Sequence, residues 1–269
     1  MSVAVPELID AVGARHAVAG ADARIVCLVP SITELVIDLG LRKHLVGRTG
    51  FCIHPRDALR GIPKVGGTKD VNLDRIRALA PTHVIVNVDE NTRETAEALA
   101  DLVPHVIVTH PLAPADNFAL YRLLGGIFGA EARAENLCAE LTEALAGVRA
   151  GPVRRVLYLI WKDPWMTVGN DTYISRTLAL FGWRTQPAAH PDRYPEVNLA
   201  EQAREVDLVL LSSEPYPFRP KHLSAVRAAC GGPPVRLIDG EMTSWYGSRA
   251  ISGLRYLAAF VGGDTAEAA

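Results

Sequence analysis

The chain has 269 residues, which exceeds the usual size of one hydrophobic core, so two lobes of roughly 100 to 130 residues each are expected. An apolar content of 49% and a charged content of 22% are typical of a folded globular protein and exclude disorder. The formal net charge of −2 provides no basic surface, so neither nucleic acid nor an anionic membrane is expected as a partner.

Residues 1–23 are expected to form an N-terminal extension that carries no export signal. They lack the basic start, the apolar core and the small-residue cleavage site of such a signal. The apolar runs of the chain also stay shorter than the ~18 residues that are needed to cross a bilayer. The chain as written is therefore expected to work in the cytoplasm or to represent a form without its leader.

The run from Arg24 to Gly40 changes its hydrophobic period at Ser31. Residues 24–29 have the β-branched content of a buried strand, and apolar residues then recur at helical spacing. Ser31 and Glu34 have the spacing of a capping box, and Gly40 is expected to end the helix in a left-handed conformation. The turn between strand and helix lies where open α/β sheets bind ligands. It contains no glycine-rich phosphate motif, so a nucleotide is not expected there.

The rest of the first lobe alternates strands with helices. A loop with Gly66-Gly67, where the backbone can turn sharply or approach a ligand, precedes a helix that Asn72 is expected to cap. Such alternation predicts a mainly parallel sheet, so residues 24–113 are expected to form an N-terminal α/β lobe. The predicted elements after Gly40 are strands over 45–49, 83–87 and 105–109 and helices over 73–79 and 92–102.

Residues 114–150 show apolar residues at three- and four-residue spacing, which predicts one long linking helix, loosened at most near Gly125-Gly126 and Gly129. Residues 151–262 return to the alternating pattern and are expected to form a C-terminal α/β lobe, followed by a frayed tail over 263–269. The predicted elements of this lobe are strands over 154–161, 207–212 and 235–238 and helices over 172–181, 199–205, 220–229 and 248–261.

A four-residue echo connects the two lobes. Val71-Asn-Leu-Asp74 and Val197-Asn-Leu-Ala200 each precede a predicted helix and then a strand. The matching context suggests that both lobes follow one plan and face each other across a cleft. Asp74 and Ala200 would then occupy equivalent positions, with Glu201 beside the second.

Several segments, in this order and spacing, resemble the substrate-binding proteins of metal-chelate importers, most closely the vitamin B12-binding members. The segments are VPSITELVIDLG, GRTGFCIHP, IPKVGGTKDVNLDRIRALAPTHVIV, PWMTVGNDTYI, RYPEVNL and SWYGSRAISGLRYL. The resemblance implies an α/β protein of class III periplasmic-binding-protein type, with two mainly parallel lobes joined by one long backbone helix. It also implies a location in the periplasm or at the cell surface and a monomer that delivers its ligand to an ABC-importer permease, without catalysis.

The resemblance further implies a metal chelate held between the lobes, and we expect a corrinoid such as cobalamin. Haem and a ferric siderophore are the alternative ligands, and a cytoplasmic corrinoid- or metallocofactor-handling protein is the alternative role. A stiff linking helix limits closure, so the site should be preformed and suited to a rigid chelate. The residues placed at ligand-facing positions are Phe51, His54, Thr68, Trp165, Met166, Tyr194, Trp245 and Tyr246.

Some of these residues allow other interpretations. Thr68 departs from the vitamin B12 binder, which has a tryptophan there, and the aromatic residues of the second lobe could instead fill its core. His54 is able to ligate iron or cobalt, and Tyr194, Tyr216 or Tyr246 could offer phenolate to ferric haem. Glu214 lies in a proline-rich loop after a strand, a position where catalytic carboxylates occur. The simpler interpretation is that the prolines stiffen the loop.

The family uses one acidic residue on each lobe to meet arginines of the permease, which implies docking through Asp74 and Glu201. The simpler reading of Asp74 is a carboxylate that stabilises the first turn of its helix. No residue is assigned to catalysis, to an intrinsic cofactor or to a resident metal, because the G-x-S-x-G and H-E-x-x-H patterns are absent. The four scattered cysteines, Cys27, Cys52, Cys138 and Cys230, are expected to be buried thiols.

Overall fold

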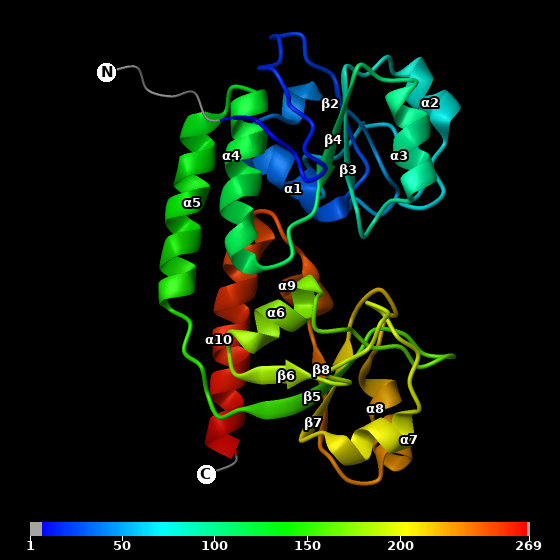
Figure 1. Ribbon diagram of the computed structural model, residues 1–269, viewed down its shortest axis with the longest axis vertical. Coiled ribbons are helices and arrows are strands. Elements are labelled where there is room, and N and C mark those ends of the chain that lie inside the picture. The colour runs from blue at the N-terminus through cyan, green and yellow to red at the C-terminus, as the bar shows by residue number, and fades with distance from the viewer. Residues whose placement is uncertain (1–6, 268–269) are drawn as a thin grey trace. The chain divides into compact units, whose positions relative to one another are not determined.

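The computed structural model describes residues 7–267, and the chain divides into two compact units (Figure 1). The first unit comprises residues 1–111, 116–140 and 246–248, and the second comprises residues 112–115, 141–245 and 249–269. One of the boundaries between the two units falls within helix α5 (Glu131–Ala146). Each unit contains one four-stranded parallel sheet, which confirms the expected fold class of two mainly parallel α/β lobes.

The sheet of the first unit has the strand order β2-β1-β3-β4. Helices α2 and α3 lie together on one face of this sheet (Figure 1), and their apolar side chains pack against those of β1 and β3 in one buried cluster. The elements are β1 (Ile25–Cys27), α1 (Pro30–Asp38), a 3-10 turn (Arg42–His44), β2 (Leu45–Arg48), α2 (Leu73–Ala78), β3 (His83–Asn87), α3 (Arg93–Ala100) and β4 (His105–Thr109).

The sheet of the second unit has the equivalent order, β6-β5-β7-β8. The elements are β5 (Arg154–Leu159), α6 (Tyr173–Ala179), β6 (Trp183–Thr185), α7 (Leu199–Gln202), a 3-10 turn (Ala203–Glu205), β7 (Leu208–Ser212), α8 (Pro220–Cys230), β8 (Val235–Ile238), α9 (Gly240–Ser244) and α10 (Arg249–Glu267). Asn72 and Asn198 cap α2 and α7 at equivalent places, so the two units follow the common plan that the sequence echo predicted.

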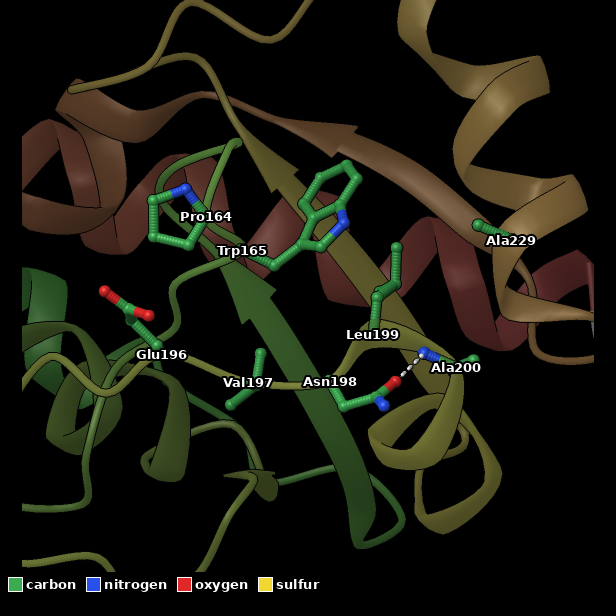
Figure 2. Close-up of a pocket in the computed structure, with 8 residues that line it drawn as sticks. All are labelled: Pro164, Trp165, Glu196, Val197, Asn198, Leu199, Ala200 and Ala229. Atoms are coloured by element: carbon green, nitrogen blue, oxygen red, sulfur yellow. Dashed lines mark hydrogen bonds between the residues drawn. The ribbon is translucent and has the colours of Figure 1, made fainter.

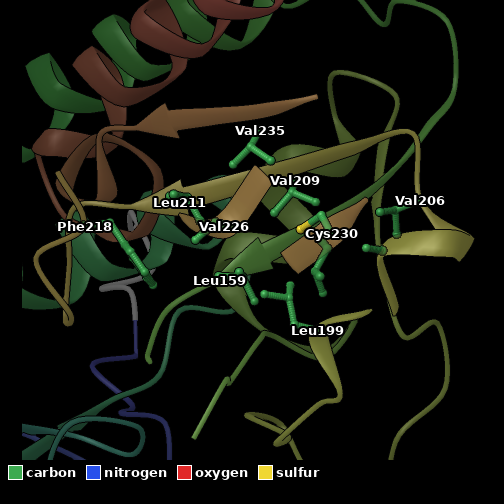
Figure 3. Close-up of a cluster of buried hydrophobic side chains, with 11 residues drawn as sticks. Leu159, Leu199, Val206, Val209, Leu211, Phe218, Val226, Cys230 and Val235 are labelled. Carbon is green, nitrogen blue, oxygen red and sulfur yellow. The ribbon is translucent and has the colours of Figure 1, made fainter. Parts of the chain in front are cut away.

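The core of the second unit lies between its sheet and helices α7 and α8 (Figure 3). Leu159 and Leu211 project from neighbouring strands toward Leu199 on α7 and Val226 on α8, and all four side chains are buried. Burial of each such side chain stabilises the folded state by about 1.5–3 kcal/mol. This packing holds fixed the strands whose carboxyl ends carry the loops described below.

The prediction of one continuous helix over 114–150 was wrong. A 3-10 turn (Pro114–Asp116) leads into α4 (Asn117–Ile127), and α5 starts again at Glu131. Gly129 adopts the left-handed conformation, with φ of +65°, and so reverses the chain between the two helices, which lie side by side in Figure 1. A Cβ atom on Gly125 would lie only 2.6 Å from that of Ala134, so the glycine permits close helix packing rather than loosening one helix.

The predicted capping box at Ser31 does not form. Helix α1 begins one residue earlier, at Pro30, and its N-cap residue Val29 contributes no side-chain hydrogen bond. Proline suits this first position because its φ is already helical and it has no N–H to satisfy. Gly40 does adopt the left-handed conformation after the helix, with φ of +79°, as predicted.

The N-terminal extension runs along the β4 edge of the first sheet. The Ala11 N–H donates to the Val108 carbonyl at 2.9 Å, and the buried Asp10 carboxylate accepts from the Val108 N–H at 3.0 Å. Residues 1–6 of the predicted extension lie outside the described residues. At the other end, α10 runs to Glu267, beyond the predicted end at Val261, and residues 268–269 of the predicted tail also lie outside the described range.

Candidate functional site

The carboxyl ends of the first sheet carry the first group of predicted site residues. Phe51 follows β2 with 63% of its side chain exposed, and a Cβ atom on Gly67 would approach its ring to 3.3 Å. Thr68 is half-buried, and its carbonyl accepts a hydrogen bond from Asn91 Nδ2 at 2.8 Å. Because Asn91 follows β3, the structure brings the loops after β2 and β3 together around Phe51 and Thr68. His54 lies half-buried in the loop that Phe51 begins.

The loop after β5 carries Trp165 and Met166 in a short antiparallel arch. The Met166 carbonyl accepts from the Ile160 N–H at 3.0 Å, and the Met166 N–H donates to the Trp161 carbonyl at 3.3 Å. Both predicted residues are half-buried. The Trp165 ring stacks on Phe218, with an interplanar angle of 4° and ring centroids 6.2 Å apart. Trp165 therefore packs partly on the core, as the alternative reading proposed, while part of its ring remains exposed.

A pocket of about 550 Å³ lies within the second unit (Figure 2). The Trp165 ring, Leu199 and Ala229 give it apolar walls, and Glu196 provides a carboxylate at its margin. The Asn198 side chain points toward α7, where it accepts hydrogen bonds from the first backbone N–H groups. Of the predicted ligand-facing residues, all of which the structure describes, Trp165 lines this pocket. Its complete lining is Pro164, Trp165, Glu196, Val197, Asn198, Leu199, Ala200 and Ala229.

Tyr194 is held in the chain that runs beside this arch. The Thr167 N–H donates to the Pro195 carbonyl at 3.0 Å, and the Gly169 N–H donates to the Arg193 carbonyl at 2.7 Å. Tyr194 itself is half-buried. The backbone of Tyr194 is therefore fixed on both sides against the segment that follows Met166.

Trp245 and Tyr246, after α9, are more buried than sequence reasoning expected, with 9% and 6% of their surfaces exposed. The Trp245 Nε1–H donates to Glu214 Oε1 at 2.7 Å, and the Arg249 guanidinium lies 4.7 Å from the centroid of the Trp245 ring. Burial raises the pKa of the Glu214 carboxyl, and hydrogen bonds from Ser244 and Trp245 oppose that rise. Sequence reasoning did not predict this contact. The feature of the sequence that could have indicated it is a glutamate two residues after a buried strand.

The two predicted docking residues occupy equivalent helix positions. Asp74 lies in the first turn of α2 with 89% of its side chain exposed, and Arg77 Nη1 contacts its carboxylate at 2.6 Å. Glu201 lies exposed in the first turn of α7, and Asn198 Oδ1 accepts from its N–H at 3.3 Å. An exposed ion pair such as Asp74–Arg77 contributes at most about 1 kcal/mol to stability, so the Asp74 carboxylate can exchange its partner at little cost.

The described residues contain no group of three or more His, Cys, Asp or Glu side chains arranged to hold a metal ion. The four cysteines are free and buried, as expected, and burial raises the pKa of Cys27 to about 12 and that of Cys230 to about 11. Within residues 7–267 no helix combines the length and apolar character that a membrane span requires.

Known proteins share this sequence pattern. The sequence profile of the periplasmic binding protein family matches residues 25–212. A vitamin B12-binding protein of Photorhabdus laumondii is 23% identical over 202 residues, which cover 73% of each chain. The uncharacterized ABC transporter substrate-binding lipoprotein YvrC of Bacillus subtilis is 26% identical over 167 residues, covering 58% of this chain and 52% of that protein.

Solved structures share the fold. The periplasmic vitamin B12 binding protein BtuF of Vibrio cholerae superposes with a TM-score of 0.76 at 17% identity, covering 89% of this chain and 96% of that chain. A periplasmic heme-binding protein of Pseudomonas aeruginosa superposes with a TM-score of 0.75 at 20% identity, covering 88% and 92%. The resemblance to metal-chelate binding proteins that the sequence motifs indicated is thereby confirmed. Because the family profile spans more than half of the chain and the fold agrees, the chain belongs to the periplasmic binding protein family.

Proposed function

We propose that the protein is a substrate-binding protein that holds a metal chelate and delivers it to an ABC-type importer. Membership of the periplasmic binding protein family is the observation that carries this proposal. It is supported by the position of most candidate residues, which lie in loops that follow the parallel strands β2, β5 and β6 at their carboxyl ends. The family consists of binding proteins, so the protein is proposed to act without catalysis, at the cell surface or in the periplasm.

A corrinoid such as cobalamin is the proposed ligand, with haem and a ferric siderophore as alternatives. The similar proteins include vitamin B12-binding and heme-binding proteins, which supports a planar macrocycle as the ligand. Phe51 and Trp165 offer exposed aromatic surface for stacking, and each good aromatic contact contributes about 0.5–1.5 kcal/mol beyond area burial. His54, Thr68, Met166, Tyr194, Trp245 and Tyr246 complete the proposed set.

Isothermal titration of the full chain with cyanocobalamin, haemin and a ferric hydroxamate tests this proposal. We expect at least one chelate to bind with a Kd below ~100 µM, which corresponds to more than about 5 kcal/mol. Absence of binding for all three, with a protein that remains folded by circular dichroism, would contradict the proposal.

A pair of variants in the same loop gives a matched control. Phe51→Ala should weaken the affinity by about tenfold, because it removes a stacking surface. Ile53→Ala should leave the affinity unchanged, since Ile53 is similarly exposed, at 51%, but is assigned no contact. Equal effects of the two substitutions would remove Phe51 from the site.

A further inference from the structure

A half-buried carboxylate that the proposed function does not use, that of Glu214, lies against Trp245. Glu214 lies two residues after the end of β7. A Cβ atom on Gly240 would lie 2.6 Å from Glu214 Cγ, so the loop fits closely against the start of α9. The Ser212 hydroxyl donates to the Glu214 carbonyl at 2.7 Å, and the Gly240 N–H donates to Ser213 Oγ at 2.8 Å. The backbone of Glu214 is thereby fixed before its side chain makes any contact.

The carboxylate reaches the far end of α9. Its Oε1 atom accepts from the Trp245 Nε1–H at 2.7 Å and from the Ser244 hydroxyl at 2.7 Å. Hydrogen bonds to a charged acceptor are stronger than neutral ones and more sensitive to direction. The indole edge of Trp245 is therefore held in one orientation by a group 31 residues away in sequence.

A second contact holds the ring face. The Arg249 guanidinium lies 4.7 Å from the Trp245 ring centroid, and its Nη1 atom contacts Glu241 Oε2 at 3.0 Å. Both side chains of this ion pair are largely buried, at 12% and 24% exposure. The contacts to the edge and to the face of the ring together restrict the two side-chain torsion angles of Trp245. A residue that stacks on a ligand binds better when its rotamer is fixed in this way.

The groups that face Glu214 come from several elements. Asp239 and Glu241 at the start of α9 are close enough to disfavour its ionised form, and Ser244 and Trp245 stabilise that form by hydrogen bonding. Tyr158 on β5 interacts electrostatically with Glu214 and is itself hydrogen-bonded to Ser212. Arg249 on α10 brings a guanidinium to the Trp245 ring and to Glu241, and Tyr256 of the same helix accepts from the Asp239 N–H at 3.0 Å.

We propose that Glu214 is a positioning residue of the ligand site, whose half-buried carboxylate fixes the orientation of the Trp245 ring for contact with the chelate. The contact with the chelate rests on the proposed function, whereas the hold on Trp245 does not. Loss of the carboxylate would leave the indole free to rotate and would lower affinity without removing any ligand-contacting atom.

Proton–nitrogen correlation spectra of the ¹⁵N-labelled full chain test the hold on Trp245. Each tryptophan indole N–H gives its own signal, and Trp245→Phe identifies the one that belongs to Trp245. In Glu214→Ala this signal should move upfield and its hydrogen exchange should quicken at least about tenfold. In Glu214→Gln, which keeps a neutral acceptor oxygen, the signal should stay near its original position but lose its titration with pH.

The control is Glu205→Gln, an exposed glutamate of the same unit, which should leave the Trp245 signal and its titration unchanged. A Trp245 signal that neither moves nor exchanges faster in a folded Glu214→Ala protein would overturn the proposal. If the alanine variant does not fold, Glu214→Gln serves as the test, because it preserves the shape and hydrogen bonding of the side chain. A Trp245 signal that titrates identically in Glu214→Gln and in the unmodified chain would also overturn the proposal.

Titration with cyanocobalamin, haemin and a ferric hydroxamate tests the effect of Glu214 on ligand affinity. Glu214→Ala should weaken the affinity of whichever chelate binds by about tenfold, and Glu214→Gln by less than about threefold. If the unmodified chain binds none of the three chelates, the proposed function fails, while the spectra still test whether Glu214 holds the Trp245 ring. If it binds and Glu214→Ala binds equally well with a displaced Trp245 signal, the positioning role is overturned.

Discussion

His83 shows how burial of a single residue is expected to tie stability to pH. It stacks on His105, with ring centroids 4.7 Å apart, and contacts the edge of Phe128. Burial lowers the pKa of His83 to about 4, with further lowering from His105 and His16. The unfolded chain takes up a proton near pH 6.5, whereas the folded chain resists it until about pH 4.

Stability is therefore expected to decrease as the pH falls from 6.5 to 4, by about 3 kcal/mol from this residue. His83→Phe keeps a ring but cannot take up a proton, so its urea-unfolding free energy should change less over this interval. The control is His190→Gln on the surface, which should retain the full slope. Parallel slopes for His83→Phe and the unmodified chain would contradict this origin of the pH dependence.

At the residue scale, sequence reasoning located some site residues but not their contacts. The exposed position of Phe51 and the burial of the cysteines follow from local patterns of glycine and apolar residues. The contact between Glu214 and Trp245 joins two loops that are far apart in sequence, and only the strand order brings them together. The burial of Trp245 was missed for the same reason, since a loop position alone favours exposure.

At the scale of elements, strong local signals were sufficient for prediction. The strand His83–Asn87 was predicted to the residue because its run is β-branched and buried throughout, and Asn72 was recognised as a cap by its type and position. The strand Trp183–Thr185 was missed because three residues with an exposed centre carry no periodic signal. Helix α9 was missed because it has five residues, although Asp239 does cap it.

The close packing of α4 on α5 leads to a prediction about Gly125. Gly125→Ala should lower the free energy of unfolding by about 1–2 kcal/mol, because the new methyl group would overlap the Ala134 side chain. Gly263→Ala in α10 is the matched control, since no atom lies within 4 Å of its added Cβ and alanine favours the helix. Equal unfolding midpoints in urea for the two variants would show that α4 and α5 do not pack as described.

At the scale of the whole molecule, the shared strand order of the two units places Asp74 and Glu201 on equivalent helices. If both dock to a permease, Asp74→Lys and Glu201→Lys should each reduce cellular uptake of the chelate by about tenfold while leaving its affinity unchanged, because neither residue belongs to the proposed ligand set. Glu205→Lys, a similar charge change nearby, should leave uptake unchanged. Normal uptake by the double variant would exclude this docking mode.

The protein is proposed to carry a metal chelate. The absorption spectrum of protein purified from its own organism tests this most directly. Corrin, haem and ferric hydroxamate absorb differently, so the spectrum reports both occupancy and ligand class. We predict a corrin spectrum with up to one chelate per chain, either as purified or after incubation with cobalamin. A protein that is colourless as purified and remains colourless after incubation with cobalamin, haemin and a ferric hydroxamate would contradict the account.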